Sequence, residues 1–472
     1  MGTFTDNGEK GTGMKRRGFL KGAAGAVLAA GFPAIVRARN ANGKLCHACI
    51  GTGNMAWGDL NSFHSHTGTE IVALCDVDAT FLERAHKLVP SARLYSDWRT
   101  MLEEEGDRID SVNVSIPDHN HTIAAVTAMR KGKHVYCQKP LCHEMDECRL
   151  IRKTAKETGV VTQLGIQYSA GLGDRLCVEY LRERAIGTIQ HVWMFSTRNG
   201  ISRIRPSLPP ASPVPAHLNW DLWIGTAPFR PYAEKVYHPL IWRIWRDFGS
   251  GWIGDIGCHL HSAFWQGLNL GETSPLTVRA EVEEAWKTNP ERRVQTWPCG
   301  AHVTWVYPGN PFTDGKPLTV EWFDGFSDPK ANTPPHLLPP PRLTELAKTV
   351  GMDALPLEGK VLEGTDGWLI LPHTSGPRFV MKNGKPEPEK LQLPKQPSHY
   401  HDFLDACIAG RPARGAFDWA TWMMEAILIG AIAERVPDTT LQWRPDPATL
   451  GNAEADKLFT RAYRDGWKLA GL

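Results

Sequence analysis

The segment that begins near residue 45 restricts the fold more than any other part of the sequence. Leu45 to Ile50 form an apolar run, Gly51-Thr-Gly-Asn-Met-Ala56 follow, and a helix-forming stretch comes next. Gly51 permits a tight turn, Gly53 lets another group approach the backbone, and the small Ala56 allows close packing of a helix on a strand. The order predicts a strand, a glycine turn and a helix whose N-terminus can bind an anion.

A second apolar run supplies the next landmark of this pattern. Ile71 to Cys75 precede Asp76, which follows the glycine turn at about the 20-residue spacing of dinucleotide-binding folds. In such folds the glycines hold the pyrophosphate and the acid accepts a hydrogen bond from a ribose hydroxyl. An acid at this position favours NAD, with its free 2′-hydroxyl, over NADP. The alternative is a glycine turn followed by a surface aspartate.

Residues 44–165 continue the alternation of strands and helices. We expect further strands at 111–116, 134–137 and 160–165, and helices at 80–90, 98–105, 120–131 and 147–158. Strands that alternate with helices predict a parallel sheet covered on both faces. The predicted fold class is therefore α/β, with a Rossmann domain over residues 44–165.

The pattern changes after residue 166. Residues 203–240 are rich in proline and aromatic side chains and predict a long loop. We expect strands at 276–286, 301–307, 317–324, 367–371 and 378–381, and helices at 398–409 and 419–434. Because helical links are missing between the strands, residues 166–472 are predicted to form a domain on an open, mainly antiparallel sheet.

The first 43 residues predict an export leader and a linker. Lys15-Arg-Arg-Gly-Phe-Leu-Lys21 precede a short Gly/Ala-rich apolar run that ends near Val36. This combination is typical of a twin-arginine signal, so we expect the chain to use that export machinery and to lie in the periplasm or otherwise outside the cytoplasm. A basic disordered N-terminus is the alternative, and translation starting at Met14 is possible. No other stretch predicts a stable membrane span.

Charge and cysteine content exclude several classes. The net charge of +2 is spread along the chain and gives no basic block for nucleic acid. Cys46 and Cys49 form a CxxC pair inside a predicted buried strand, and no second pair completes a zinc pattern. We therefore predict no metal site.

A polar stripe within an apolar helix marks a candidate site. In residues 251–268, Asp255, His259, Ser262 and Gln266 fall on one narrow face at helical periodicity. A histidine can move a proton near neutral pH, and a carboxylate one turn away can orient it. The same pair also suits an ordinary surface helix, and the residues alone leave both interpretations open.

A strand-end lysine is the third candidate feature. The predicted strand 134–137 leads into Gln138-Lys139-Pro140. Ligands bind at the carboxyl ends of parallel strands, where the ammonium of Lys139 could hold a substrate hydroxyl. A solvated lysine is the alternative.

Together these segments resemble the glucose–fructose oxidoreductase / inositol dehydrogenase / MocA (Gfo/Idh/MocA) family, over the chain from about Lys44 to the C-terminus. The matching landmarks are Gly51 to Ala56, Cys75 to Asp78, Pro117-Asp-His-Asn-His121, Gly132 to Pro140 and Asp255-Ile-Gly-Cys-His259. Asn219 to Gly225 and Phe248 to Asp255 resemble its exported, sugar-acting branch.

The resemblance implies a catalytic set and a cofactor site. It assigns catalysis to Lys139, Asp255 and His259. It assigns cofactor binding to Gly51, Thr52, Gly53, Asn54, Met55, Asp76, Pro117, His119, His121, Gln138 and Lys139. It also implies a carbohydrate or glycoside substrate and a homo-oligomer packed through the open sheet.

Two positions depart from the family pattern. The family usually has Glu where this chain has Gln138, and often has Asp where this chain has Ser262, with His261 beside it. Gln138 can still form hydrogen bonds but carries no charge. Ser262 removes a possible second acid.

These features predict an exported NAD-dependent oxidoreductase that acts on a ring hydroxyl of a sugar, sugar derivative or glycoside and keeps its cofactor bound. One alternative is a redox-neutral glycosidase or lyase that oxidises, eliminates, hydrates and reduces, with His261, His119 or His121 as an extra base. For each of these histidines a structural role is the competing interpretation. The other alternative is a sugar-binding relative without turnover.

Overall fold

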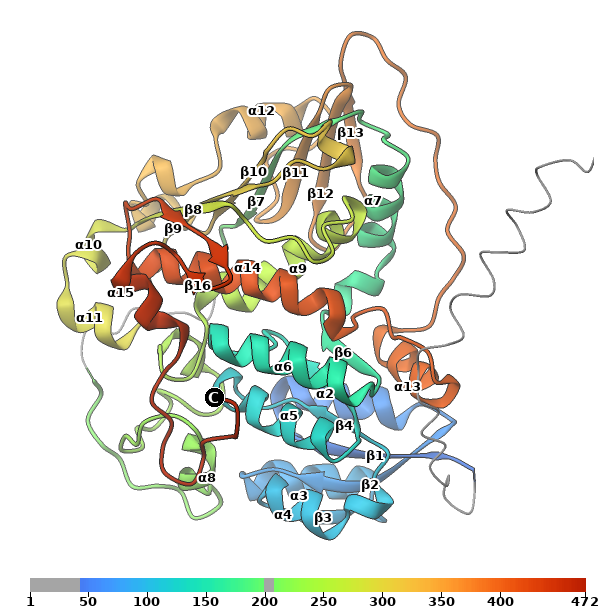
Figure 1. The fold of residues 1–472 in the computed structure, drawn as a ribbon, viewed down its shortest axis with the longest axis vertical. Coiled ribbons are helices and arrows are strands. Elements are labelled where there is room, and N and C mark those ends of the chain that lie inside the picture. Colours follow the sequence, from blue (N-terminus) through green and yellow to red (C-terminus); the bar gives the residue numbers. More distant parts are fainter. Residues whose placement is uncertain (1–42, 199–207) are drawn as a thin grey trace, which may run out of the picture. The chain divides into compact units, whose positions relative to one another are not determined.

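The computed structural model describes residues 43–198 and 208–472, so the predicted leader lies outside the described residues. Its first part is a six-stranded parallel sheet in the order β3-β2-β1-β4-β5-β6 (Figure 1). The strands are β1 (Leu45–Ile50), β2 (Thr69–Cys75), β3 (Arg93–Tyr95), β4 (Ser111–Val114), β5 (His134–Gln138) and β6 (Thr162–Gly165). Except for the edge strand β3, these strands are almost continuously buried, as is typical of a sheet that is covered on both faces.

Helices cover both faces of this sheet. They are α2 (Asn54–His64), α3 (Ala79–Leu88), α4 (Trp98–Glu104), α5 (His121–Arg130) and α6 (Met145–Thr158). Leu60 and Phe63 of α2 and Ala85 of α3 pack in one apolar cluster, whereas α4, α5 and α6 contribute to another. The predicted doubly wound Rossmann fold is confirmed.

The strand register explains why the motifs meet. Ile50 pairs with both Cys75 and Val114, and Val114 pairs with Cys137. The carboxyl ends of four neighbouring strands are therefore level, and the segments that follow them emerge at one edge of the sheet.

The second part is an eight-stranded mixed sheet in the order β13-β12-β11-β7-β10-β9-β8-β14. Its strands are β7 (Ile189–Ser196), β8 (Thr277–Val282), β9 (Ala301–Tyr307), β10 (Leu318–Phe323), β11 (Glu358–Gly364), β12 (Gly367–Pro372), β13 (Arg378–Met381) and β14 (Leu441–Gln442). All neighbours are antiparallel except β7 and β10, so the mainly antiparallel sheet is confirmed.

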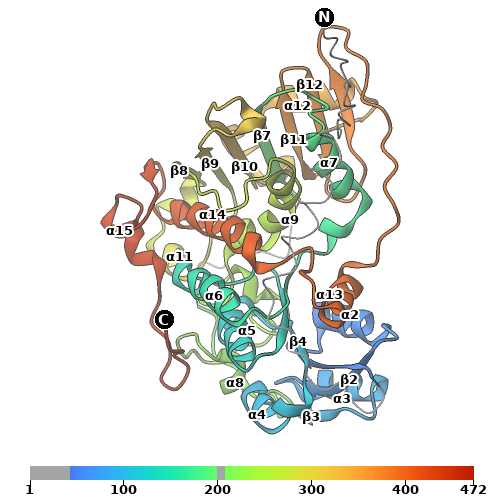
Figure 2. The ribbon, with the colours of Figure 1, turned by 45° about the vertical axis from the view of Figure 1, so that its right-hand side comes forward.

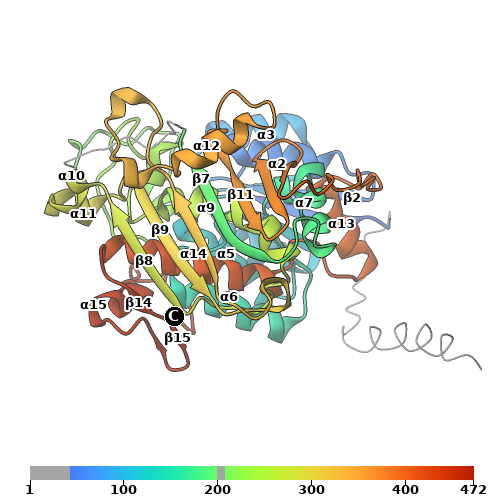
Figure 3. The same cartoon turned by 90° about the horizontal axis from the view of Figure 1, so that it is seen from above.

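Helices also flank this second sheet (Figure 3). They include α7 (Leu172–Arg182), α9 (Gly251–Gly267) and α14 (Phe417–Arg435), whose apolar side chains share one core with the inner sheet face. On the other face, Leu343 and Ala347 of α12 (Pro341–Lys348) pack over Trp193 and Phe195.

Some predicted elements differ from the structure. The strand expected at 276–286 ends at Val282, and α10 (Glu284–Lys287) follows, then α11 (Pro290–Gln295). Within the described part of the expected loop at 203–240, the structure has a short helix, α8 (Trp220–Ile224). Helix α7 and strands β7 and β11 were not predicted.

The C-terminal segments return to the first sheet. Helix α13 (His399–Ala409) packs beside α2, and α14 packs against α6 (Figure 2). After α15 (Ala453–Asp456) the chain runs along the first part to the C-terminus. None of the helices in the described ranges is long and apolar enough to cross a bilayer.

Candidate active site

A cavity lies at the carboxyl ends of the parallel strands. Many of the predicted cofactor residues line it: Gly51, Gly53, Asn54, Met55, Asp76, Pro117, Gln138 and Lys139. Of the other predicted residues, Thr52, His119 and His121 are not among the described residues of its wall. The structure therefore brings most of the predicted set together around one space.

The glycine turn has the shape that a dinucleotide requires. Gly51 has φ +93°, and a Cβ there would lie 2.2 Å from the Ser115 carbonyl oxygen. A Cβ on Gly53 would lie 2.1 Å from the Phe81 ring. None of the described side chains caps the N-terminus of α2, so its first backbone N–H groups stay available to an anion. These residues fit a bound pyrophosphate.

Asp76 lines the cavity and also supports the turn. Its Oδ2 accepts hydrogen bonds from the backbone N (2.8 Å) and the Oγ1 (3.0 Å) of Thr52, and its Oδ1 accepts one from Asp78 N (2.9 Å). Thr52 therefore does not line the cavity itself; it donates to Asp76 and holds that cavity residue in place.

His119 and His121 pack inside the protein. His119 is fully buried, with Nε2 3.1 Å from the Trp223 carbonyl oxygen. His121 is 1% exposed and lies between the carbonyl oxygens of Ile116 and Pro140. Burial lowers the pKa of His121 to about 4. The structure gives both residues a packing role.

Lys139 and Asp255 form the centre of the site. Lys139 Nζ is 2.6 Å from Asp255 Oδ1 and 2.8 Å from the Asp255 carbonyl oxygen. Arg243 Nε lies 3.3 Å from the same Oδ1. Burial alone raises the pKa of Asp255, but Lys139 and Arg243 outweigh it and hold that pKa well below its usual range. The carboxylate is therefore ionised at neutral pH and fixes both cations.

His259 lies one turn further along α9 and is 5% exposed. Its ring packs against Tyr168 and His373, with centroids 5.8 and 5.2 Å away. Its Nδ1 has no hydrogen-bond partner among the residues that the structure describes. Burial, reinforced by the charge of Lys139, holds the pKa of His259 well below 6.5. A neutral imidazole with an open ring nitrogen can accept a proton.

The two departures from the family pattern have local explanations. Gln138 Nε2 donates to Asp59, at 2.8 Å from Oδ2 and 3.1 Å from Oδ1, and Gln138 Oε1 accepts from Lys139 N at 3.2 Å. Ser262 is 1% exposed, and its Oγ accepts from Gln266 Nε2 at 3.1 Å. Neither side chain is left without a partner.

Asp118 is a site residue to which the sequence interpretation gave no role. It lines the cavity at 3% exposure, and its Oδ2 accepts a hydrogen bond from Ser250 N at 3.1 Å. Burial, followed by the charge of Asp255, raises its pKa to about 7. This contact fixes the start of α9 beside the first sheet.

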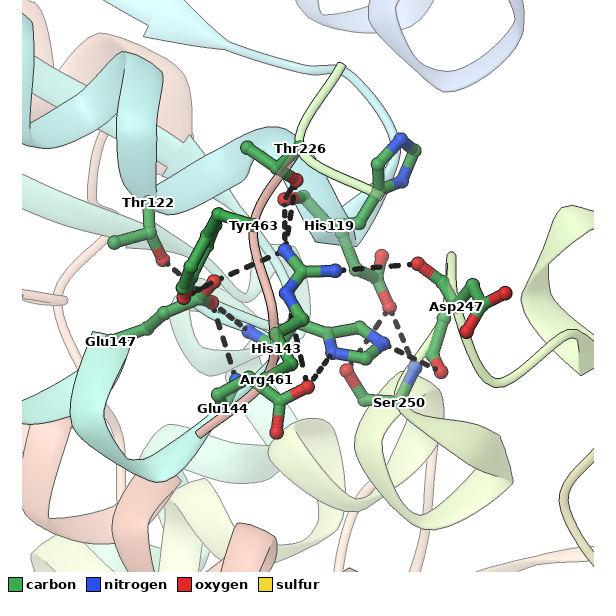
Figure 4. Close-up of polar contacts among 12 residues, drawn as sticks. His119, Thr122, His143, Glu144, Glu147, Thr226, Asp247, Ser250, Arg461 and Tyr463 are labelled. Carbon is green, nitrogen blue, oxygen red and sulfur yellow. Dashed lines mark hydrogen bonds and ion pairs between the residues drawn. The ribbon is translucent and has the colours of Figure 1, made fainter. Parts of the chain in front are cut away.

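Arg461 on the C-terminal tail joins the segments around the site (Figure 4). It donates to the carbonyl oxygen of His119 (2.7 Å), Thr226 Oγ1 (2.9 Å) and Glu147 Oε1 (3.1 Å). Glu147 is 1% exposed and also accepts a hydrogen bond from Tyr463 at 2.7 Å. One guanidinium thus ties α6 and the segment after β4 to the second part of the chain.

The described residues contain no group of three or more His, Cys, Asp or Glu side chains that could hold a metal. His261, considered as an extra base, is fully buried, and its Nδ1 bonds to the Gly257 carbonyl oxygen at 2.9 Å. Burial lowers its pKa to about 3.

Comparison with known proteins gives the family. A family model described as "Oxidoreductase family, NAD-binding Rossmann fold" matches residues 46–166, and one described as "Oxidoreductase family, C-terminal alpha/beta domain" matches residues 188–299.

Curated relatives match over part of their length. A levoglucosan dehydrogenase of Pseudarthrobacter phenanthrenivorans is 31% identical over 35% of this chain and 34% of its own. A glycosyl hydrolase family 109 protein of Shewanella woodyi is 29% identical over 30% of this chain and 32% of its own. A D-apiose dehydrogenase of Paraburkholderia graminis is 29% identical over 30% and 37%. These matches span about a third of each relative.

Solved structures match the fold over most of the chain. The aldose-aldose oxidoreductase of Caulobacter crescentus has a TM-score of 0.55 at 17% identity, covering 84% of this chain and 99% of its own. A levoglucosan dehydrogenase complex with NADH and levoglucosan has a TM-score of 0.54 at 17% identity, with the same coverage. These two structures share the fold of this chain. The two domain models, over residues 46–166 and 188–299, place it in the Gfo/Idh/MocA oxidoreductase family.

Proposed function

We propose that the protein is an NAD-dependent oxidoreductase that acts on a ring hydroxyl of a sugar or glycoside. The observation that carries the proposal is that Lys139 lines the cavity and pairs with Asp255, while the neutral His259 lies one turn further along α9. A bound nicotinamide supplies the hydride acceptor.

Each site residue has a distinct task. His259 accepts the hydroxyl proton as the substrate carbon gives up its hydride. Lys139 holds the hydroxyl oxygen and stabilises its developing negative charge. Asp255 bonds to Lys139 at 2.6 Å, so it orients that lysine. The sequence alone suggested that Asp255 would orient His259 or the substrate.

We infer NAD rather than NADP, held tightly. Asp76 lies at the cavity wall, and a second carboxylate, Asp78, follows it, so a 2′-phosphate would meet negative charge. Residues 238–243 contribute His238, Pro239, Leu240, Trp242 and Arg243 to the same wall. Asn54 Nδ2 donates to the Pro239 carbonyl oxygen at 3.2 Å, and His238 Nε2 is 2.9 Å from Asp78 Oδ2. This covering segment supports slow cofactor exchange.

A redox-neutral cycle is the second candidate, favoured by the glycosyl hydrolase family 109 relatives. Oxidation of a ring hydroxyl makes the C–H beside the new carbonyl acidic. Loss of that proton expels the glycosidic group, water adds, and the stored hydride returns to the carbonyl carbon. No outside oxidant is consumed, which suits a protein with the twin-arginine leader that we propose at residues 15–21.

The test begins with purified protein. After denaturation we expect release of NAD. Cleavage of a glycoside from a broad panel by the intact protein, without added NAD, would indicate the redox-neutral cycle. Reduction of added NAD by a free sugar would instead indicate a plain dehydrogenase. Absence of both activities and of any bound dinucleotide would contradict the proposal and support a non-catalytic sugar-binding protein.

A further inference from the structure

The redox-neutral cycle needs a second base besides His259, which takes the proton from the carbon next to the new carbonyl. The sequence suggested His261, His119 or His121 for this task. His119 is fully buried and His121 is 1% exposed. His261 is also fully buried, and it bonds to the carbonyl oxygen of Gly257 at 2.9 Å. These three imidazoles are packed away from any substrate, so the cycle needs a base from another segment.

His373 lies beside His259. It follows β12, and its backbone N donates to the Glu358 carbonyl oxygen at 3.0 Å, which extends the pairing of β12 with β11 by one residue. The centroids of the His373 and His259 rings are 5.2 Å apart. One imidazole thus comes from the second sheet and the other from helix α9, and the two meet at one place.

Tyr168 reaches this pair of rings from the first sheet. The last residue of β6 pairs with the last residue of β5, so the segment after β6 emerges next to Lys139. The Tyr168 ring lies 4.5 Å from the His373 ring and 5.8 Å from the His259 ring, centroid to centroid. Tyr168 is 44% exposed, so the cluster of three rings reaches the surface on this side.

His373 is in the form that can accept a proton. Its Nδ1 is buried and, like Nδ1 of His259, has no hydrogen-bond partner in the described part of the chain. Burial, followed by the charges of nearby cations, lowers the pKa of His373 to about 4, so the imidazole is neutral at pH 7. These cations are Lys360, Arg198 and Lys139. The charge of Lys139 also lowers the pKa of His259, so the same ammonium lies near both rings.

We propose that His373 is the second base of the site and takes the proton from the ring carbon next to the one that is oxidised. The inference rests on the redox-neutral cycle described under the proposed function. The two protons sit on neighbouring positions of one sugar ring, so two bases close together are required, and the adjacent His259 and His373 rings meet this requirement. Lys139 holds the carbonyl oxygen and stabilises the negative charge that develops there.

Atoms and electrons balance with water as the co-reactant. As His373 takes the proton, the C–H electron pair forms a C=C bond and the glycosidic C–O bond breaks. The leaving oxygen takes a proton from water, and the hydroxide that remains adds to the carbon that lost the glycosidic oxygen. His373 then returns its proton to the neighbouring carbon. The hydride returns to the carbonyl carbon and the proton on His259 returns to its oxygen, so the net reaction is hydrolysis.

The test follows solvent deuterium in the purified holoprotein. The glycoside panel is incubated in deuterated water; nuclear magnetic resonance measures deuterium at each ring carbon, and the absorbance of reduced nicotinamide measures hydride transfer. The wild type should incorporate deuterium at one ring carbon, beside the oxidised one. In His373→Ala the ratio of deuterium incorporation to hydride transfer should fall about 10²–10⁴-fold, and added imidazole should restore part of it.

Two further variants serve as controls. His336→Ala should keep the wild-type ratio, because His336 lies at an exposed position of η7 (Pro335–Leu337). Tyr168→Phe keeps the ring that packs on His373 and removes the hydroxyl, so it tests whether the tyrosine is the base instead. If H373A does not fold, His373→Gln gives the same comparison, since an amide does not accept the proton.

Each outcome decides the inference. An unchanged ratio in H373A, or a loss in Y168F alone, would overturn it. A loss in H373A that added imidazole leaves unaltered would assign His373 a structural role. Hydride transfer without deuterium incorporation in the wild type would overturn the inference and leave a plain dehydrogenase standing. Absence of both hydride transfer and deuterium incorporation would contradict the proposed function, and the inference with it.

Discussion

At the residue scale, Gln138 is explained by a neighbour distant in sequence. Asp59 is fully buried and accepts hydrogen bonds from Gln138, from Ser115 Oγ at 2.7 Å and from the Tyr400 hydroxyl at 2.8 Å. Burial raises the pKa of Asp59 to about 6, although these donors oppose the shift. A glutamate at 138 would face a second buried carboxylate, so the amide satisfies Asp59 where an acid would repel it.

The first prediction follows from this pair. Gln138→Glu should lower the free energy of unfolding at pH 7.5 by about 2–4 kcal/mol, because two buried carboxylates would meet. Asp59→Asn in the same chain should recover most of the loss, since an asparagine amide can donate to the new glutamate. Urea denaturation of the double-mutant cycle measures the coupling. Additive effects of the two changes would show that the residues do not interact.

The second prediction concerns His259 and pH. A general base works only when it is deprotonated, so the activity of the enzyme is lost as the pH falls through the pKa of the base. Burial and the charge of Lys139 place the pKa of His259 below 6.5. The acid limb of kcat/KM should therefore lie well below pH 6.5. His259→Ala should lower kcat by about 10²–10⁴-fold with unchanged thermal stability. An acid limb at pH 6.5 or above in the wild type would contradict the lowered pKa of the His259 imidazole.

At the element scale, regular patterns were predictable and irregular ones were not. β1, β2, β4 and β5 are apolar runs bounded by turns, and the sequence predicted them. Strand β7 was not predicted. Val192 to Ser196 are all buried, because α12 covers the outer face of the strand. The alternation of buried and exposed residues that marks a half-exposed strand is therefore absent.

The residues of the candidate site also divide into those that the sequence predicted and those that it did not. Lys139 follows a strand, and Asp255 and His259 share a helix face, so spacing identified them. Arg243 and His373 come from segments without periodicity and reach the site through tertiary packing. No local signal marked them, because neither residue belongs to an α-helix or a β-strand.

The C-terminal tail gives the element-scale prediction. Burial raises the pKa of Glu147, but Arg461 and the other partners of Glu147 outweigh burial and hold this pKa below its usual value. The ion pair between Arg461 and Glu147 therefore stabilises the fold above pH 4.5, and it stabilises the fold less as the pH falls and Glu147 takes up a proton. Arg461→Gln should cost about 3–5 kcal/mol at pH 7, because Glu147 would stay buried without its cation. The cost should shrink near pH 4, where the variant's Glu147 takes up a proton.

The matched control lies on the same tail. Arg464 pairs with Asp221, whose side chain is 69% exposed, so Arg464→Gln should cost about 1 kcal/mol or less. Chemical denaturation at pH 7 and pH 4 compares both variants. Equal losses at both positions would rule out a special role for Arg461.

At the scale of the whole molecule, the two sheets share one core. Apolar side chains of α5, α6, α9 and α14 belong to the same cluster, and the cofactor cavity is walled by both parts of the chain. Residues 238–243 come from the second part and cover a site built on the first.

The whole-molecule prediction concerns cofactor retention. His238→Ala removes the contact with Asp78 and should raise the dissociation rate of bound NAD about tenfold, because a partly buried hydrogen bond to a carboxylate is worth roughly 1.5 kcal/mol. Stopped-flow displacement of the cofactor gives the rate. His64→Ala, at an exposed position of α2, is the control. Identical rates in wild type and H238A would show that the segment does not retain the cofactor.

The central claim is that Lys139, Asp255 and His259 move a hydride and a proton at a sugar ring with a retained cofactor. Rapid mixing of the purified holoprotein with the glycoside panel, followed through the absorbance of reduced nicotinamide, tests it most directly. We expect a fast rise with at least one glycoside, no added NAD being needed, and no such rise in H259A with the same bound cofactor. A holoprotein that shows no absorbance change with any glycoside, or an H259A variant that reacts as fast as the wild type, would contradict the account.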